Sequence, residues 1–361
     1  MCSNRLSQRR DGLHLPSISL LSRIHPTSNM IALGVIGTGW ITRDFVAHAE
    51  ATKQWKLAAV YSRKEETAKE FGAKFGVDRV HTSTGALFND SDVQAVYIAS
   101  PNSLHYEQAK QALIAGKHVI LEKPATSTVA EFEELCALAA RQSLFLIEAW
   151  RHIQEANFHV LKSNISKLGP ILGGHVVMAK YSSRYDEVLK GGEPNIFSLK
   201  FSGGCLVDMG CYPVMFAVAL FGQPKGQTYA PIIIESTGAD AGGVIVLRYE
   251  GFAVSINTSK CYTSTTATEI YGHNGTIVVN GATGCTDIDK VDFVNLKTKK
   301  TEQLATQKAE LNLQEEAAEF ARIINEKDTG AAQKLEELSG IVLRITTDLR
   351  KQNGIVFDVE K

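Results

Sequence analysis

The chain has 361 residues, of which 44% are hydrophobic and 21% charged, and its formal net charge is -1. This length predicts about two domains, each able to bury a core of its own. A net charge this close to zero excludes a strong general attraction to nucleic acid or to an anionic membrane surface, so we expect a small-molecule partner.

Cysteine usage predicts a reducing compartment. The six cysteines form no Cys-x-x-Cys pair and no tight Cys/His cluster that could close around zinc. We therefore expect free thiols, a cytoplasmic protein and no metal site. The cysteines are Cys2, Cys136, Cys205, Cys211, Cys261 and Cys285.

Residues 1–30 form an N-terminal extension whose composition differs from that of the remaining chain. Before Met30 it carries four arginines against one acid, Asp11, together with six serines. Such a composition is typical of organelle transit peptides, which would make the protein organelle-targeted. The alternative, which we favour, is a disordered or artefactual extension, because Met30 stands directly before the first expected strand.

The first expected strand, Ile31 to Ile36, leads into a glycine-containing turn and then a helix. Strand, glycine turn and helix are the parts that a dinucleotide site needs. Gly37 would allow the tight turn, and Gly39 would let a pyrophosphate approach the free N–H groups of the helix. Thr42 stands where a third glycine is usual, so the motif is incomplete. The cofactor contacts expected here are Gly37, Thr38, Gly39, Trp40 and Ile41.

The next strand, Lys56 to Tyr61, ends where an acidic residue would hold the ribose hydroxyls of NAD. No acid is present, and Ser62, Arg63 and Lys64 follow instead. A hydroxyl and two cations suit the 2′-phosphate of NADP, so we predict NADP in preference to NAD. The structural alternative is that Arg63 and Lys64 merely begin the following helix.

A third expected strand, Val93 to Ala99, is followed by polar residues that would lie at the same edge of the sheet. These residues are Ser100, Asn102 and His105, and a helix begins after them. Asn102 and His105 can therefore face the nicotinamide half of a bound cofactor. For His105, a helix-capping or core position is an equal alternative.

The run from Val119 to Leu121 predicts a short buried strand that stops abruptly at Glu122 and Lys123. Charges there lie at a strand's carboxyl end, which is where ligands bind in an open parallel sheet. We therefore predict that Glu122 and Lys123 belong to the site. The alternative is a strand that ends in solvated charge.

The alternating strands and helices, up to the strand Leu144 to Ile147, predict a Rossmann-type doubly wound parallel sheet over residues 31–150. Residues 151–361 contain long strand-like alternation, from Ile232 to Val279. This predicts an α+β domain with a large, mainly antiparallel, open-faced sheet. If the open face is apolar, it would bury itself against a second subunit, so we expect a homodimer.

A largely apolar stretch, Cys205 to Phe221, is too short and too interrupted to span a bilayer and predicts a buried helix. Asp208 and Tyr212 are four residues apart and would share one face of that helix. Either they satisfy each other or they converge on a ligand. Pro213 would kink the helix or lie in its first turn.

These motifs together resemble the glucose-fructose oxidoreductase, inositol dehydrogenase and rhizopine-catabolism (GFO/IDH/MocA) family of nicotinamide oxidoreductases. The similarity runs from Ile31 to the C-terminus and is strongest to the branch that contains dimeric dihydrodiol dehydrogenase and NADP-dependent D-xylose dehydrogenase, in which tyrosine replaces a histidine at Tyr212. The motifs are Gly37-Thr38-Gly39, Ser62-Arg63, Ser100-Pro101-Asn102 with His105, Glu122-Lys123-Pro124, and Gly203-Gly204 leading to Asp208, Gly210 and Tyr212.

The resemblance implies a mechanism in which a substrate hydroxyl gives its proton to Tyr212 and hydride passes to the nicotinamide. The tyrosine would need a pKa about two to three units below its ordinary value of about 10, favoured by Lys123 and by the positive nicotinamide ring. The resemblance implies that Asp208 orients Lys123 or the substrate, and that Lys123-Pro124 is a cis peptide. It implies cofactor contacts from Ser62, Arg63, Ser100, Asn102, His105, Glu122, Lys123, Trp150 and Arg151.

The motifs and the resemblance together predict an NADP-dependent dehydrogenase that acts on a CH–OH group of a sugar or a vicinal diol. Tyr181, Arg184 and Tyr185 are candidate substrate contacts, although such residues also occur in ordinary solvated loops. Two alternatives stay open. One is a non-catalytic NAD(P)-binding regulator of the same fold, and the other is an NAD-dependent polyol or inositol dehydrogenase.

Overall fold

The structure, a computed structural model, describes residues 30–281 and 284–361. A six-stranded parallel sheet, here called sheet A, has the strand order β3-β2-β1-β4-β5-β6. The order reverses between β1 and β4, and ligands bind outside the carboxyl ends of strands at such a point. The predicted Rossmann-type sheet is confirmed. Its strands are β1 (Ile31–Ile36), β2 (Trp55–Tyr61), β3 (Val80–His81), β4 (Ala95–Ile98), β5 (His118–Leu121) and β6 (Leu146–Glu148).

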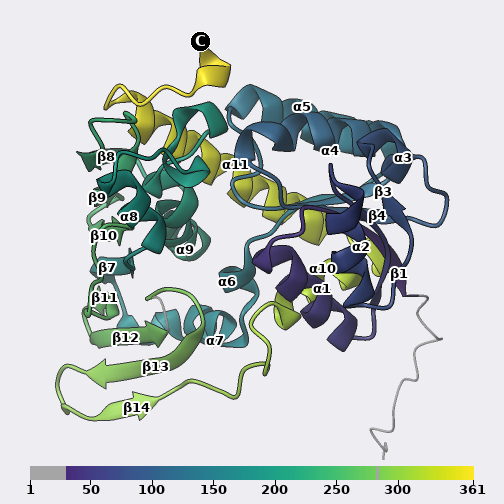
Figure 1. Ribbon diagram of the computed structural model, residues 1–361. Coiled ribbons are helices and arrows are strands. Elements are labelled where there is room, and N and C mark those ends of the chain that lie inside the picture. Colours follow the sequence, from purple (N-terminus) through teal and green to yellow (C-terminus); the bar gives the residue numbers. More distant parts are fainter. Residues whose placement is uncertain (1–29, 282–283) are drawn as a thin grey trace, which may run out of the picture.

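Helices pack on both faces of sheet A and form two apolar cores with it (Figure 1). Burial on both faces explains why these strands are continuous apolar runs in the sequence. The helix that follows β5 begins with a capping box between Thr128 and Glu131. The helices are α1 (Trp40–Ala51), α2 (Glu65–Ala73), α3 (Thr84–Phe88), α4 (His105–Ile114) and α5 (Val129–Gln142).

The second sheet, sheet B, has eight strands in the order β14-β13-β12-β11-β7-β10-β9-β8. Neighbouring strands are antiparallel except β7 and β10, which are parallel. The predicted antiparallel sheet is confirmed. Its strands are β7 (Ile171–Ala179), β8 (Gly226–Ile233), β9 (Asp240–Arg248), β10 (Ala253–Ser259), β11 (Thr268–Gly272), β12 (Gly275–Gly281), β13 (Ile288–Asn295) and β14 (Thr301–Gln303).

One face of sheet B packs against α9 (Cys211–Phe221), whose side chains are almost all buried. Within the described residues, one helical stretch, Leu199–Phe221, is long and apolar enough to cross a membrane by length and composition alone. Most of it lies inside the protein, which confirms the predicted core helix. Other helices of this part are α6 (Arg151–Gln154), α7 (Ala156–Asn164) and α8 (Ser183–Leu189).

The last two helices join the two parts of the molecule. The apolar side of α10 (Gln314–Glu326) completes the core that α1 forms with sheet A, and Trp55 Nε1 donates to the Ala317 carbonyl at 2.7 Å. The longer α11 (Thr329–Lys351) packs against α5 and β6 in the first part and against α9 and β8 in the second. Although α10 lies within the second predicted domain, residues 151–361, its apolar residues therefore belong to the core of sheet A.

Candidate active site

At the carboxyl edge of sheet A, α6 follows β6, and Lys123 after β5 contacts a single π-helical turn, Leu206–Gly210, that leads into α9. Pro213 lies in the first turn of α9. Most sequence-predicted site residues lie on these segments.

The glycine turn after β1 fits a pyrophosphate. Gly37 has φ +103°, and a Cβ there would lie 2.6 Å from the Ala99 carbonyl oxygen. A Cβ on Gly39 would meet nothing within 4 Å, so the space above the turn is open. The N-terminus of α1 has no side-chain cap and no acid in its first turn, which leaves its N–H groups for an anion. Thr42, at the third-glycine position, is fully buried beside Gly37.

Ser62 and Arg63 directly follow β2, at the same sheet edge. Arg63 is exposed and makes no ion pair within residues 30–281 and 284–361, so its guanidinium is available to a ligand. Glu65 and Glu66, the first acids after β2, begin α2 instead.

The turn after β4 links the two parts of the molecule. Asn102 Nδ2 donates to the Ser202 carbonyl at 3.0 Å, and the hydroxyl oxygens of Ser127 and Ser202 lie 2.6 Å apart. Ser100 donates from its hydroxyl to Gln108 at 2.7 Å. In this state the polar side chains of Ser100 and Asn102 contact protein groups.

His105 occupies the core position that the sequence left as an alternative. It is buried, and its two ring nitrogens lie 3.0 Å from the Pro124 carbonyl and 2.9 Å from the Ser100 carbonyl. Burial lowers the pKa of this imidazole. Both ring nitrogens therefore lie against backbone carbonyls, as expected of the core alternative. His105 holds the two loops that present Asn102 and Lys123.

Glu122 follows β5 and is held by Tyr97 of β4, whose hydroxyl donates to Oε1 at 2.5 Å. Burial raises the pKa of Glu122, and the adjacent Lys123 ammonium acts in the opposite direction. The hydrogen bond fixes the carboxyl at the strand end, where it can accept from a hydroxyl of a bound ligand.

Lys123 lies at the centre of the site. Its Nζ donates to Asp208 Oδ1 at 2.8 Å and to the Asp208 carbonyl at 2.9 Å, and it is 4.9 Å from the centre of the Tyr212 ring. The Lys123-Pro124 peptide is cis, as the resemblance implied. Burial opposes the charge on Lys123, but Asp208 outweighs it and holds the lysine pKa well above its ordinary value. Lys123 is therefore a permanent cation near neutral pH.

Asp208 binds a second lysine, which the sequence analysis missed. Lys260 directly follows β10, is 6% exposed, and its Nζ forms an ion pair with Asp208 Oδ2. Burial raises the pKa of Asp208, but Lys123 and Lys260 outweigh it and hold that pKa well below the usual range. Its position directly after a strand was the available sequence signal, but that position alone does not show a contact with Asp208.

The protein groups around Tyr212 shift its pKa upward, and the lower value expected above also requires the positive nicotinamide ring. In the structure, burial raises the pKa of the phenol, and Lys123 opposes this without reversing it. The tyrosine ring packs edge-on against His152 and Trp150, with centroid distances of 5.1 and 5.9 Å. In the described part of the chain its hydroxyl has no hydrogen-bond partner, and the side chain is only partly buried. That hydroxyl is free to meet a ligand.

Trp150 and Arg151, expected as cofactor contacts, contact the protein instead. Trp150 is 1% exposed, and its indole N–H donates to Glu148 and Ser339 at 2.7 and 3.0 Å. The Arg151 guanidinium makes two parallel 2.7 Å bonds to the Asp287 carboxylate. The structure therefore places Trp150 in the core and Arg151 in an ion pair between α6 and the start of β13.

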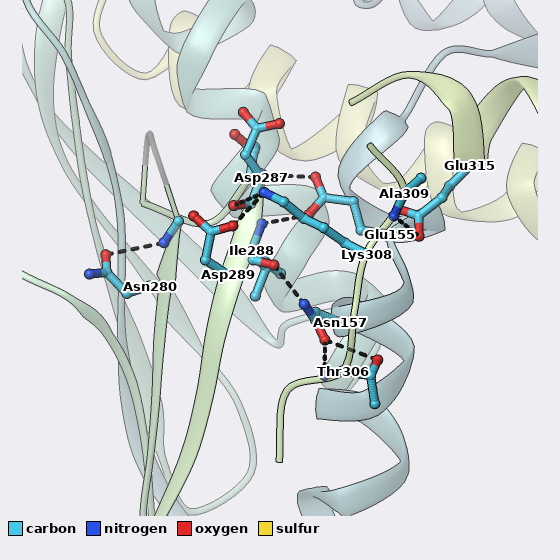
Figure 2. Close-up of polar contacts among 12 residues, drawn as sticks. Glu155, Asn157, Asn280, Asp287, Ile288, Asp289, Thr306, Lys308, Ala309 and Glu315 are labelled. Carbon is cyan, nitrogen blue, oxygen red and sulfur yellow. Dashed lines mark hydrogen bonds and ion pairs between the residues drawn. The ribbon is translucent and has the colours of Figure 1, made fainter. Parts of the chain in front are cut away.

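Glu155, which the sequence analysis did not single out, also links the end of α6 to the start of β13. Figure 2 shows Glu155 facing the start of β13, where its carboxylate accepts from the N–H groups of Asp287 and Ile288 at 2.8 and 2.7 Å. Asn157 extends the contact by donating to the Ile288 carbonyl at 2.8 Å and accepting from the Thr306 N–H at 2.8 Å. These bonds fix the position of α6, and so of His152, which packs against the Tyr212 ring.

The three candidate substrate residues lie on and before α8. Tyr181 is 42% exposed and donates to Asp186, and Arg184 pairs with Glu187. Tyr185 packs edge-on between the rings of Tyr181 and Phe197. The polar ends of Tyr181 and Arg184 are satisfied within this segment, so the geometry gives them no contact with Lys123 or Tyr212.

Comparison with known proteins gives two family matches along the chain. Residues 31–149 match the model described as "Oxidoreductase family, NAD-binding Rossmann fold" (GFO_IDH_MocA), and residues 167–278 match the GFO/IDH/MocA C-terminal domain. The two matches correspond to sheet A and to most of sheet B.

Curated relatives align over 60% to 92% of this chain. The uncharacterized oxidoreductase YgjR of Escherichia coli is 38% identical over 92% of this chain and 99% of its own length. The scyllo-inositol 2-dehydrogenase (NADP(+)) IolU of Bacillus subtilis is 35% identical over 92% of this chain and 100% of its own. Mouse trans-1,2-dihydrobenzene-1,2-diol dehydrogenase is 30% identical over 60% of this chain and 65% of its own.

Solved structures share the fold. KijD10, a 3-ketoreductase from Actinomadura kijaniata crystallised with NADP, superposes with a TM-score of 0.72 over 90% of this chain and 97% of its own, at 23% identity. An oxidoreductase from Agrobacterium radiobacter in complex with NAD+ gives a TM-score of 0.72 over 90% of this chain and 97% of its own, at 15% identity. At these identities the likeness concerns the arrangement of the two sheets.

Proposed function

The chain belongs to the GFO/IDH/MocA family of oxidoreductases, and from this premise we propose that it is an NADP-dependent dehydrogenase of a sugar or a vicinal diol in which Lys123 and Tyr212 form the acid–base pair. That it is an NAD(P)-dependent oxidoreductase follows from the family and its dehydrogenase relatives. The cofactor preference, the substrate and the roles of the two residues are the proposal.

One observation carries the acid–base assignment. Lys123 is held by Asp208 with its ammonium 4.9 Å from the Tyr212 ring, beside a phenol hydroxyl that lacks a hydrogen bond to any described residue. A fixed cation next to a free phenol favours the phenolate, and a phenolate is a competent base for an alcohol.

The protein's part in the reaction is to bind, orient and move a proton. The substrate hydroxyl donates to Tyr212 Oη, the proton passes to the phenolate as the C–O bond gains double-bond character, and Lys123 stabilises the negative charge on either oxygen. When bound, the nicotinamide would supply the acceptor for the hydride that leaves the same carbon. For carbonyl reduction, Tyr212 returns the proton.

The lower pKa that Tyr212 needs depends on cofactor binding. Burial raises its pKa in the structure, so the positive nicotinamide ring must add to the effect of Lys123 before the phenol ionises near neutral pH. The glycine turn of Gly37 and Gly39 and the free N-terminus of α1 would hold the pyrophosphate, with Glu122 near the sugar.

Two observations support NADP. Ser62 and Arg63 lie at the end of β2, and Arg63 has no ion-pair partner among the residues described. A relative that aligns over its full length has NADP(+) in its name and acts on an inositol, which is a cyclic vicinal polyol. The same relative is the reason to include inositols among the substrates tested.

We also propose a cytoplasmic location and a homodimer. The five described cysteines are free, which fits a cytoplasmic location. The uncovered face of sheet B includes Val244 (48% exposed), Ile232 (42%) and Tyr271 (36%) beside polar side chains such as Ser255 and Asn257. A homodimer through this face would bury those apolar groups, and light scattering would measure it.

The deciding experiment measures initial rates of the purified protein with NADP and with NAD against aldoses, inositols and vicinal diols. We expect turnover with a higher kcat/KM for NADP, and a loss of about 100- to 10,000-fold in kcat for Y212F. Full turnover by Y212F would refute the acid–base assignment, and a preference for NAD would refute the assignment of Ser62 and Arg63. NADPH binding without any turnover would favour a cofactor-binding regulator.

A further inference from the structure

Lys260 is a buried lysine close to the reacting groups whose position is fixed by sheet B. Its backbone N–H donates to the Ala241 carbonyl at 2.8 Å, and its carbonyl accepts from the Ser182 N–H at 2.9 Å. The side chain is 8% exposed and its ammonium lies 6.0 Å from the Phe197 ring centre. The lysine therefore has little freedom to reach any acid other than Asp208.

Two cations consequently share one carboxylate. Asp208 gives Oδ1 to Lys123 at 2.8 Å and Oδ2 to Lys260. A single lysine paired with Asp208 would be electrically neutral as seen from Tyr212. Three charged groups leave the cluster with one positive charge in excess, in a site where burial strengthens electrostatic interactions.

We propose that Lys260 is a positioning residue that holds Asp208 by its second oxygen and thereby leaves Lys123 with an uncompensated positive charge beside Tyr212. Lys260 acts through Asp208 and touches no reacting atom. The inference rests on the proposed role of Tyr212 as the acid–base group.

Other groups also act on the Tyr212 hydroxyl and must stay constant in a test. They are Lys123 and Glu122 after β5, Arg151 and His152 on α6, Cys211 on its own helix and Tyr97 of β4. Burial lowers the pKa of His152 to about 3, so this ring is neutral across the useful pH range. Substitution of Lys260 changes none of these residues.

The test compares the pH profile of kcat for alcohol oxidation in wild type, K260M and K260Q. Oxidation needs the phenolate, so kcat rises with pH up to the pKa of Tyr212. Loss of the Lys260 charge should move this rise upward by about one pH unit, which lowers kcat about tenfold at pH values below it, with substrate KM changed less than about twofold. K260Q removes the charge but keeps a hydrogen-bond donor, and it provides the test if K260M is unstable.

Two controls separate charge from structure. K260R keeps the cation and should restore the profile to within about half a unit of wild type. K297M removes an exposed lysine in the turn between β13 and β14 and should leave the profile unchanged. A uniform loss of kcat at all pH values with an unmoved rise would overturn the proposal, because it would show a purely structural role.

A parallel Y212F series distinguishes an error in the role of Lys260 from an error in the role of Tyr212. If the rise with pH persists in Y212F, the proposed function of Tyr212 is wrong. If Y212F abolishes the rise and K260Q leaves it in place, only the role of Lys260 is wrong. A readout without turnover is the ultraviolet absorbance of tyrosinate with NADP bound, taken as the difference between each protein and its Y212F counterpart. The midpoint should be higher in K260Q, and an unchanged midpoint would contradict the proposal.

Discussion

The Lys123 ammonium lies 4.9 Å from the centre of the Tyr212 ring and donates a 2.8 Å hydrogen bond to Asp208 Oδ1. At this distance the ammonium stabilises a phenolate directly, while Asp208 keeps the lysine charged and in place. The relationship makes Lys123 the residue whose loss should affect chemistry most and cofactor binding least.

Replacement of Lys123 by methionine should lower kcat by about 100- to 10,000-fold, because it removes the cation that favours the Tyr212 phenolate. The Kd for NADPH, measured by fluorescence titration, should change less than about threefold. Asp208 keeps Lys260 as a partner in K123M. The free energy of unfolding should therefore fall by less than the value of about 3 kcal/mol that is typical when a buried charge loses its partner. Wild-type turnover in K123M would contradict the assignment.

Replacement of Arg63 by alanine should weaken NADP binding about 10- to 100-fold and leave NAD binding within about twofold. The reason is that only NADP carries a phosphate for the guanidinium, and a hydrogen bond to a charged group contributes about 1.5 to 3 kcal/mol. K74A, which removes an exposed lysine at the end of α2, is the matched control. Equal losses for the two cofactors would argue against a phosphate contact.

Arg151 should prove to be a structural residue. Its side chain is 14% exposed and is bonded through both terminal nitrogens to Asp287, so R151M should lower the free energy of unfolding by about 3 kcal/mol. The double variant R151M/D287N should recover part of this loss in urea denaturation, because the orphaned carboxylate is gone. A loss of NADP affinity above about thirtyfold, with stability unchanged, would restore the cofactor role predicted from the sequence.

Glu155 gives a test of pH dependence away from the reacting groups. Burial raises its pKa from 4.5 to about 7, although two backbone N–H groups and Arg151 act in the opposite direction. The folded protein therefore keeps this proton to higher pH than the unfolded chain. Stability contributed by the protonated form is complete below about pH 4.5 and is lost as pH rises towards 7.

Urea denaturation of wild type and E155Q between pH 5 and 8 measures this loss of stability over most of the interval between the two pKa values, 4.5 and about 7. The free energy of unfolding of wild type, relative to E155Q, should fall by up to about 1.4 kcal/mol per pH unit and level off above pH 7. A difference that grows with pH would show that the carboxylate is already ionised in the folded protein.

The parts of the site that could be predicted from sequence are those that follow strands of sheet A. Lys123 ends a buried apolar run, and chain order alone places it at the carboxyl edge with Gly37 and Arg63. Lys260 could not be placed this way, because its contact with Asp208 depends on how β10 lies against the turn before α9. For His105 the sequence left a core position and a cofactor contact equally open, since no pattern shows that two carbonyls lie against both of its nitrogens.

In the fold, too, some features could be predicted from the sequence and others depend on tertiary packing. The alternation of strands with helices predicted sheet A, and the alternation of residues within strands predicted sheet B. The apolar stripe of α10 does not specify which sheet it covers, and it covers sheet A. Likewise Tyr212 could be recognised as a candidate, whereas the direction of its pKa shift depends on burial that only the packed structure reveals.

The packing of α10 and α11 also has a consequence for biosynthesis. Phe320 and Ile323 complete the first core, and Ile345 and Leu349 belong to the second, so both cores need residues from the last part of the chain. A nascent polypeptide cannot finish either core while these helices are still inside the ribosome. Premature stop codons before Leu313 should therefore yield chains with two exposed apolar surfaces, which are substrates for chaperones and proteases rather than partly active fragments.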